Sequence, residues 1–272
     1  MNETYAEPYY LSFLQWLFSD GFPPDKYTCP VAASDGCLQV LQWASNNNFP
    51  WDEETCMLAA MNNHWDVLVF AYENGCPWDE RTCSGIAIIA DVEMLKWARE
   101  NGCPWDYRTC AYAAKYGRCE VLQYARENNC PWDHRTCSYA AMSGKLEALK
   151  WARTNGCPWN KDTCSNAAKS GHLHVLRWAR ANGCEWDKSI CSLAAGSGHL
   201  NILQWAKENG CPWDMHTCSL AARKGHLDIL KWAHDNDCPC NSRDVLSQAT
   251  IGNHRKIVQW IKNTYPLLTG PH

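Results

Sequence analysis

The chain is built from similar sequence repeats. In each repeat, two successive segments space their apolar and polar positions with the period of an α-helix. In residues 214–240, the small side chains of Cys218, Ala221 and Ala222 have the i, i+3, i+4 spacing of one helix face, which predicts a short first helix. A broader apolar stripe follows and predicts a second helix. The positions of that stripe are Ile229, Leu230, Trp232 and Ala233. The pattern therefore predicts an antiparallel pair of helices.

Polar and glycine positions mark the ends of both predicted helices. Asp214 stands where an N-cap belongs, because its carboxylate can accept the free N–H groups of a first turn. Gly225 suits the left-handed position that ends the first helix. In most repeats a second glycine ends the second helix, and a Cys-Pro-Trp run that cannot continue the helix usually follows. These glycines are Gly75, Gly102, Gly156, Gly183 and Gly210.

The helix pair recurs at a fixed step, which is shown by a Trp-Asp pair and by the cysteine of a Thr-Cys pair. The Trp-Asp pairs begin at Trp51, Trp78, Trp105, Trp132, Trp186 and Trp213. A fixed step of this length, about 27 residues, is typical of a solenoid, in which each repeat contacts only its neighbours. We therefore expect an all-α solenoid with an N-terminal capping half-repeat in residues 1–27, eight repeats in 28–243 and a C-terminal capping repeat in 244–272.

The two capping segments depart from the repeat. The N-terminal segment is expected to use Leu11, Leu14, Trp16 and Leu17 as its core stripe. In the C-terminal segment one residue is inserted after Gly252, and its polar positions fit a cap that faces water.

Charge is distributed unevenly along the 272 residues, although the net charge is only −4. Residues 1–81 carry 12 acidic and 2 basic residues, whereas the remainder carries 17 acidic and 23 basic residues. This asymmetry either orients a partner or favours contact between copies, or it reflects drift among solvated side chains.

Targeting signals are not evident. Residues 1–18 lack the basic start and the long apolar stretch of a signal peptide, and no run of ~20 apolar residues occurs, so no membrane partner is expected. The 18 cysteines are therefore expected to be reduced thiols in a cytoplasmic protein.

Two segments of the repeat resemble the ankyrin repeat. They are the Ala-Ala-x-x-Gly-His-Leu run at 194–200 and 221–227, and the Asn-Gly-Cys-Pro-Trp-Asp exit; the likeness covers about residues 25–262. Ankyrin repeats usually have about 33 residues. The missing residues fall where ankyrins carry a β-hairpin finger, so the resemblance implies that this finger is absent or shortened. The short Trp- and Cys-rich repeat is similar to ankyrin-like arrays of giant DNA viruses of amoebae and some protists. If the protein is viral, the expected location is the host cytoplasm or a viral factory.

The resemblance also implies a protein-binding surface on the first helices. In ankyrins, the two residues after Ala-Ala face a concave groove and vary with the partner. These positions, and the position two residues after the Thr-Cys cysteine, supply the candidate residues Leu58, Met61, Ile88, Ile89, Tyr112, Lys115, Tyr116, Tyr139 and Met142. Exposed Ile, Met and Tyr side chains in one patch favour a protein interface. Packing between repeats is the alternative, above all for Leu58, Tyr112 and Tyr139.

The second helices carry a rival surface, because lysines and arginines recur along one edge with i, i+3 spacing. These residues are Lys96, Arg99, Arg126, Lys150, Arg153, Arg177, Arg180, Lys207 and Lys231. Such a row can follow a polyanion, either nucleic acid or an acidic protein. Acidic residues interleave with the row and no aromatic platforms are expected beside it, so a solvated, charge-balanced face is the alternative and nucleic acid is not the expected partner.

Cysteines with C-x6-C spacing, such as Cys76 and Cys83, allow a zinc-binding thiol array in which His172, His199 or His226 would complete the ligand set. The alternative is that these cysteines are small core residues and that the histidines make backbone hydrogen bonds. Phosphate-binding loops and a Ser-His-Asp constellation are not evident. We therefore expect no metal, no cofactor and no catalysis. The predicted function is a scaffold or adaptor that binds a host or viral protein.

Overall fold

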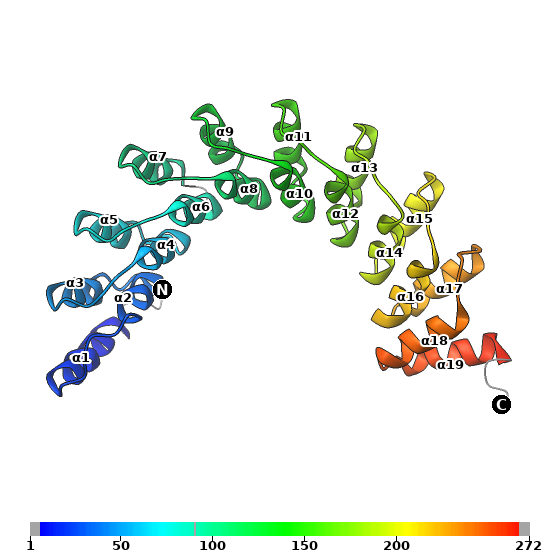
Figure 1. The fold of residues 1–272 in the computed structure, drawn as a ribbon, viewed down its shortest axis with the longest axis horizontal. Helices are drawn as coiled ribbons and strands as arrows, with labels where there is room; N and C mark the ends of the chain where they lie inside the picture. The colour runs from blue at the N-terminus through cyan, green and yellow to red at the C-terminus, as the bar shows by residue number, and fades with distance from the viewer. Residues whose placement is uncertain (1–5, 90, 267–272) are drawn as a thin grey trace. The chain divides into compact units, whose positions relative to one another are not determined.

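The computed structural model describes residues 6–89 and 91–266, which form nineteen helices and no strand. The helices belong to two compact units, Met1–Trp132 and Asp133–His272, and each unit is a series of stacked helix pairs (Figure 1). Within the described ranges, no helix has the length and apolar character needed to cross a lipid bilayer. The predicted all-α class is confirmed.

The first unit begins with a single helix and continues with four helix pairs. Its helices are α1 (Ala6–Ser19), α2 (Thr28–Asp35), α3 (Leu38–Asn46), α4 (Glu53–Met61), α5 (Trp65–Glu73), α6 (Glu80–Ile89), α7 (Val92–Glu100), α8 (Tyr107–Tyr116) and α9 (Cys119–Glu127). The even-numbered helix of each pair is the first helix of a repeat, and the odd-numbered helix is the second.

The second unit contains five helix pairs and keeps the same order within each pair. Its helices are α10 (His134–Met142), α11 (Leu146–Thr154), α12 (Lys161–Lys169), α13 (Leu173–Ala181), α14 (Ser189–Gly196), α15 (Leu200–Glu208), α16 (Met215–Lys224), α17 (Leu227–Asp235), α18 (Ser242–Ile251) and α19 (Arg255–Thr264).

Neighbouring first helices pack closely because their buried faces carry small side chains. In α8, Cys110, Ala113 and Ala114 are fully buried where the helix packs against α6. Neighbouring second helices such as α7 and α9 contact each other much less, because larger buried side chains such as Leu95 and Leu122 hold them apart. The core of each unit therefore lies between its two layers of helices.

The β-hairpin finger is absent from the described repeats, as the short repeat predicts. Asp52 caps α4 directly, since its Oδ1 accepts the Glu54 N–H at 3.0 Å, and no residues remain for a hairpin before the helix. Equivalent caps are Asp106, Asp133, Asn160 and Asp214. The fold is an all-α array of antiparallel helix pairs without fingers.

The predicted left-handed positions are found at the helix ends. Gly225 follows α16 with φ 90°, and Gly102 follows α7 with φ 83°. Asn129 and Asp237 take the same conformation where a repeat lacks this glycine. In the last repeat Gly252 has φ −74° and Asn253 has φ 57°, so the inserted residue moves the left-handed position by one.

Trp16 does not belong to the core of α1. Its side chain is 57% exposed, whereas Leu11, Leu14 and Leu17 are half-buried. Two residues correspond to about 200° around an α-helix, so Trp16 lies on the opposite side of α1 from the half-buried Leu14. The predicted core stripe is therefore correct for the three leucines and wrong for Trp16.

Asp187 holds the start of α14 through a hydrogen bond and an ion pair. Its Oδ1 accepts the Ser189 N–H at 2.9 Å, and its Oδ2 lies 3.0 Å from Nζ of Lys161. The hydrogen bonds from Ser189 and the ammonium of Lys161 lower the pKa of Asp187 to about 2 from 3.8. A carboxylate whose pKa is lower in the folded than in the unfolded chain stabilises the fold at pH values above its unfolded pKa. This stabilisation is lost as the pH falls toward its folded pKa.

Asp187→Ala is expected to lower the free energy of unfolding by about 1 kcal/mol at pH 7, since the cap is lost and solvent screens the ion pair. The difference from the unsubstituted protein is expected to shrink between about pH 4 and pH 2. Urea unfolding at pH 7 and pH 3, followed by circular dichroism, measures both values. The same difference at the two pH values would contradict the assigned role of the carboxylate.

Candidate protein-binding face

The predicted binding residues of the first unit lie on three adjacent first helices. They are Leu58 and Met61 on α4, Ile88 and Ile89 on α6, and Tyr112, Lys115 and Tyr116 on α8. Helix α6 packs against both α4 and α8, so the helices that carry these residues lie side by side. Met61 is 40% exposed and Tyr116 is 38% exposed, and the other five side chains are half-buried. All seven are therefore accessible at the surface; together they are called the first-helix face below.

Lys115 lies between two tyrosines of its own helix. Its Nζ is 6.0 Å from the ring centroid of Tyr112 and 5.2 Å from that of Tyr116. Cation–π attraction of this kind contributes about 0.5–1 kcal/mol at exposed sites and restricts the side chains that make it. The end of α8 thus offers a restricted group of two aromatic rings and one positive charge, a mixture that protein interfaces favour.

Neighbouring repeats support the backbone beneath the first-helix face. Met61 covers Gly85 of α6, where an added Cβ would lie 2.8 Å from Cγ of Met61. The carbonyl oxygen of Ile88 accepts a hydrogen bond from Nε of Arg118 at 3.0 Å, which ties the end of α6 to the start of α9. The helices that carry the first-helix face are therefore held in place by neighbouring repeats before a partner binds.

The two remaining predicted residues lie at the start of the second unit. Tyr139 and Met142 are on α10, and both are half-buried. On α12, α14 and α16 the two positions after Ala-Ala are small or polar, and Lys169 on α12 and Arg223 and Lys224 on α16 are exposed. The large apolar side chains at these phases of the second unit are Met142 on α10 and Ile251 on α18, which is 63% exposed.

Six of the nine cations on the predicted basic edge lie over tryptophan rings. The arginine Cζ atoms are 4.2 Å from the ring centroids in the pairs Arg99–Trp105, Arg126–Trp132, Arg153–Trp159 and Arg180–Trp186. Two further contacts are Lys207–Trp213, at 4.1 Å from Nζ, and Arg177–Trp205, at 5.9 Å from Cζ. The expectation that no aromatic platforms accompany this edge is wrong. The turn after the second helix brings a tryptophan beneath Arg99, Arg126, Arg153, Arg180 and Lys207, whereas Trp205 beneath Arg177 lies on α15.

The cations of this edge are largely engaged within the chain. Arg153 donates a hydrogen bond to the Cys157 carbonyl, and Arg99, Arg126 and Arg180 make the equivalent bond in their repeats. Lys96 forms an i, i+3 ion pair with Glu93 at 2.7 Å, and Lys150 forms one with Glu147 at 2.8 Å. Lys231 is exposed. The basic edge therefore joins the second helices to the Trp-Asp turns.

Arg153→Ala is expected to lower the free energy of unfolding by about 1–2 kcal/mol, because it removes both the contact with Trp159 and the hydrogen bond to the Cys157 carbonyl. The exposed Lys231 offers a control, and Lys231→Ala is expected to change the free energy by less than about 0.5 kcal/mol. Urea unfolding followed by tryptophan fluorescence compares them. Equal effects of the two substitutions would show that the contacts of Arg153 with Trp159 and with the Cys157 carbonyl add no stability.

The buried cysteines form pairs, but the two partners lie about one helix pair apart within the same repeat and do not have the predicted C-x6-C spacing. Cys56 lies against Cys76, and Cys83 lies against Cys103. The thiol of Cys76 also donates to the Asp52 carbonyl at 3.3 Å. Contact with Cys76 and burial raise the pKa of Cys56, so this thiol is neutral at pH 7. Two thiols are fewer than the four ligands of a zinc site, and these cysteines act as small core residues and S–H donors.

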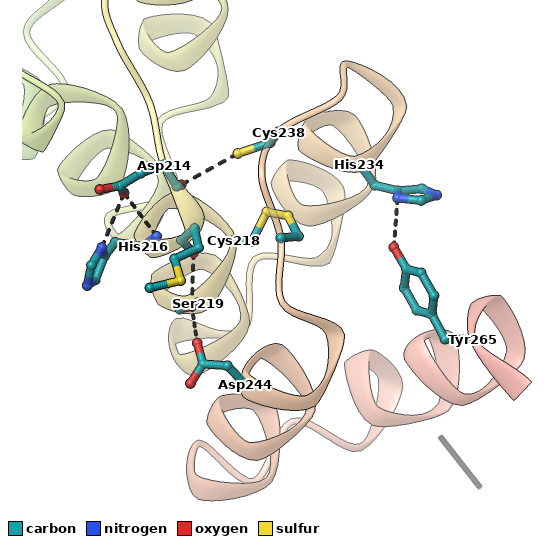
Figure 2. Close-up of a disulfide and its surroundings, with 10 residues drawn as sticks. Asp214, His216, Cys218, Ser219, His234, Cys238, Asp244 and Tyr265 are labelled. Carbon is teal, nitrogen blue, oxygen red and sulfur yellow. Dashed lines mark hydrogen bonds and ion pairs between the residues drawn. A yellow bond between two sulfur atoms is a disulfide. The ribbon is translucent and has the colours of Figure 1, made fainter. Parts of the chain in front are cut away.

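One place within residues 6–89 and 91–266 gathers three potential metal ligands. The Sγ atoms of Cys218, Cys238 and Cys240 lie within 4.8 Å of one another. Cys218 and Cys240 are joined in a disulfide (Figure 2), so the expectation that every cysteine is a reduced thiol is wrong for this pair. Cys240 is absent from the residues predicted from sequence. The sequence feature that could have identified Cys240 is its position in the repeat. It lies one full repeat after Trp213, at a position that is tryptophan in the other repeats.

Histidines at the start of the second helices connect adjacent repeats. Nε2 of His64 donates to the Ser34 carbonyl at 3.1 Å, and Nε2 of His199 donates to the Lys169 carbonyl at 3.2 Å. Arg118 makes the equivalent bond in the repeat of α8 and α9. These contacts are the backbone hydrogen bonds expected of residues beside the glycine turn.

Comparison with known proteins identifies the fold. No family model matches the chain, and no curated protein matches it in sequence. Among solved structures, the crystal structure of the human ASB11 ankyrin repeat domain is similar, with a TM-score of 0.52 and 15% sequence identity. The match covers 70% of this chain and 98% of that chain. At this identity the likeness shows the fold alone, which is that of a helical ankyrin-type repeat array.

Proposed function

We propose that this chain is a non-catalytic protein-interaction module, a scaffold or adaptor that binds a host or viral protein through the first-helix face. The observation that carries the proposal is the row of accessible apolar and aromatic side chains on α4, α6 and α8. Tyr139 and Met142 on α10 of the second unit are two further candidates. The likeness in fold to an ankyrin repeat domain supports an interaction role in general.

The residues of the face suit a partner with an apolar segment beside an acidic side chain. Tyr112 and Tyr116 supply large contact areas and lose little conformational freedom on binding, because each has only two side-chain torsions. Lys115 between them provides a positive charge for a carboxylate. Because the first helices are already packed on both sides, binding orders few additional groups.

The basic second-helix edge supports a polyanion partner less well, because its arginines already stack on tryptophans and donate to carbonyl groups. Nucleic acid is therefore not part of the proposal. We place the module in the cytoplasm, where cellular reductants keep most paired thiols reduced.

A pull-down tests the proposal. The tagged protein and the double variant Met61→Asp/Tyr116→Ala are incubated with amoebal lysate, which is chosen because the short repeat resembles arrays of amoebal viruses. The control is Met215→Asp, since Met215 is 47% exposed on α16 and lies outside the first-helix face. Circular dichroism establishes that all three proteins are folded.

The proposal expects a protein that is retained by the unsubstituted chain and by the Met215 variant but is lost from the Met61/Tyr116 variant. Retention that is insensitive to 0.3 M salt would separate this mode of binding from polyanion binding, which weakens steeply with salt. Identical sets of retained proteins for all three chains would contradict the first-helix face as the binding site.

A further inference from the structure

The last complete repeat departs from the others at one position of the Trp-Asp turn. Six earlier turns carry a tryptophan at this phase followed by aspartate, whereas residues 238–240 read Cys-Pro-Cys. Elsewhere the tryptophan covers the next second helix, as where Trp213 packs on Trp232 with ring centroids 5.8 Å apart. A cysteine buries far less apolar surface than tryptophan, so packing alone does not account for Cys240.

The substitution places a third sulfur beside an ordinary cysteine pair. Cys218 and Cys238 occupy the positions of the pairs found in other repeats, and both are buried. Cys240 is half-buried and borders a small cavity lined by Leu230, Val245 and Trp260 among others. The three Sγ atoms lie within 4.8 Å of one another, which is the spacing that ligands of one ion require.

The group itself contains sulfur atoms alone, and no imidazole or carboxylate of the described residues lies within the same 4.8 Å. His234 borders the cavity beside Cys240, and its Nδ1 is hydrogen-bonded to the Tyr265 hydroxyl at 3.0 Å (Figure 2). The nearby polar side chains shown in Figure 2 are already bonded: His216 to Asp214 at 3.2 Å, and Asp244 to the hydroxyl of Ser219. Zinc in structural sites takes four ligands, whereas soft thiolate sets favour monovalent copper.

We infer that Cys218, Cys238 and Cys240, in their reduced form, make a three-thiolate site for a soft thiophilic metal ion of the class of Cu(I). This inference is independent of the first-helix face. The Cys218–Cys240 disulfide and the metal-bound state exclude each other, because both use the same two sulfurs.

The steps between the two states balance. A dithiol reductant transfers one electron pair to the Cys218–Cys240 disulfide, the two cysteines each take a proton, and the reductant leaves as its own disulfide. Cu(I) then binds as three thiols release three protons.

The test titrates reduced, desalted protein with Cu(I) under anaerobic conditions in the presence of a competing colorimetric chelator. The informative variant is Cys240→Trp, which restores the residue found at this phase in the other repeats, and Cys240→Ser is a second variant that does not depend on fitting the larger ring. The control is Cys119→Ser, a half-buried cysteine on α9. Circular dichroism confirms the fold of each chain.

The expected result is one tightly bound Cu(I) in the unsubstituted chain and in the Cys119 variant, with an ultraviolet thiolate-to-metal charge-transfer band. Both Cys240 variants are expected to bind at least about 100-fold more weakly, because a ligand itself is removed. The oxidised protein is expected to take up no metal at this site until it is reduced. Unchanged affinity in folded Cys240 variants would overturn the assignment, and so would binding of Zn²⁺ that competes equally with Cu(I).

Discussion

The double substitution Met61→Asp/Tyr116→Ala is expected to weaken binding of the protein partner by at least about 100-fold, because a charge replaces one exposed apolar contact and the main aromatic anchor is lost. These are the two most exposed apolar residues of the first-helix face, at 40% and 38%. The melting temperature is expected to change by only a few degrees, since neither side chain belongs to the core. Isothermal titration calorimetry with the purified partner measures the loss of affinity.

Ile88→Asp would be a less clean test of the same face. Ile88 is half-buried, so a carboxylate there would also disturb the packing between α6 and its neighbours. The matched controls for the double substitution are Met215→Asp and Tyr27→Ala, which change residues that are 47% and 64% exposed outside the face. Affinity losses of similar size in the controls would mean that the effect is not specific to this surface.

Leu149→Ala is expected to lower the free energy of unfolding by about 3 kcal/mol, within the range of roughly 2–5 kcal/mol for fully buried leucines. Leu149 has no exposed surface and lies on α11, where it fills the space between the helix layers of the second unit. Each repeat is stabilised by its neighbours, so the cavity also weakens the adjacent pairs. Urea unfolding followed by circular dichroism measures the change.

Lys150→Ala is the control for this substitution, because Lys150 is the next residue on the same helix and its side chain makes an ion pair at the surface. A change of less than about 0.5 kcal/mol is expected for that variant. A loss below about 1 kcal/mol for Leu149→Ala would instead indicate that the second-helix stripe is loosely packed.

The regular part of the fold could be predicted from sequence because the same local signals recur in every repeat. Asp214 caps its helix and Gly225 takes the left-handed conformation, as their residue types require. The inserted residue after Gly252 is also visible in the sequence, and in the structure Asn253 takes the left-handed position. Local backbone chemistry decides all three features, so one sequence suffices.

Contacts that depend on how the chain turns back on itself could not be predicted in this way. The stacking of Arg153 on Trp159 joins two side chains across a turn, and helical spacing gives no information about such a contact. The pairing of Cys56 with Cys76 likewise depends on how a repeat closes and not on the shorter C-x6-C spacing. Trp16 is a different case, because its position on α1 and not its aromatic character determines its exposure.

The candidate binding residues could be predicted from sequence only because they occupy equivalent positions in successive repeats. The structure adds the support beneath them, such as the place that Gly85 leaves for Met61. It also adds the cation–π contacts of Lys115 with its two tyrosines. A single sequence does not indicate these contacts, because they depend on side-chain rotamers.

Hydroxyl-radical footprinting of the chain with and without its purified partner tests the central claim most directly, because methionine and tyrosine side chains react readily when they are exposed. The first-helix face predicts that the partner protects Met61 and Tyr116, while Met215 and Tyr27 react at unchanged rates. Protection of second-helix residues such as Trp65 with unchanged reaction of Met61 and Tyr116 would contradict the claim that the first-helix face is the binding site.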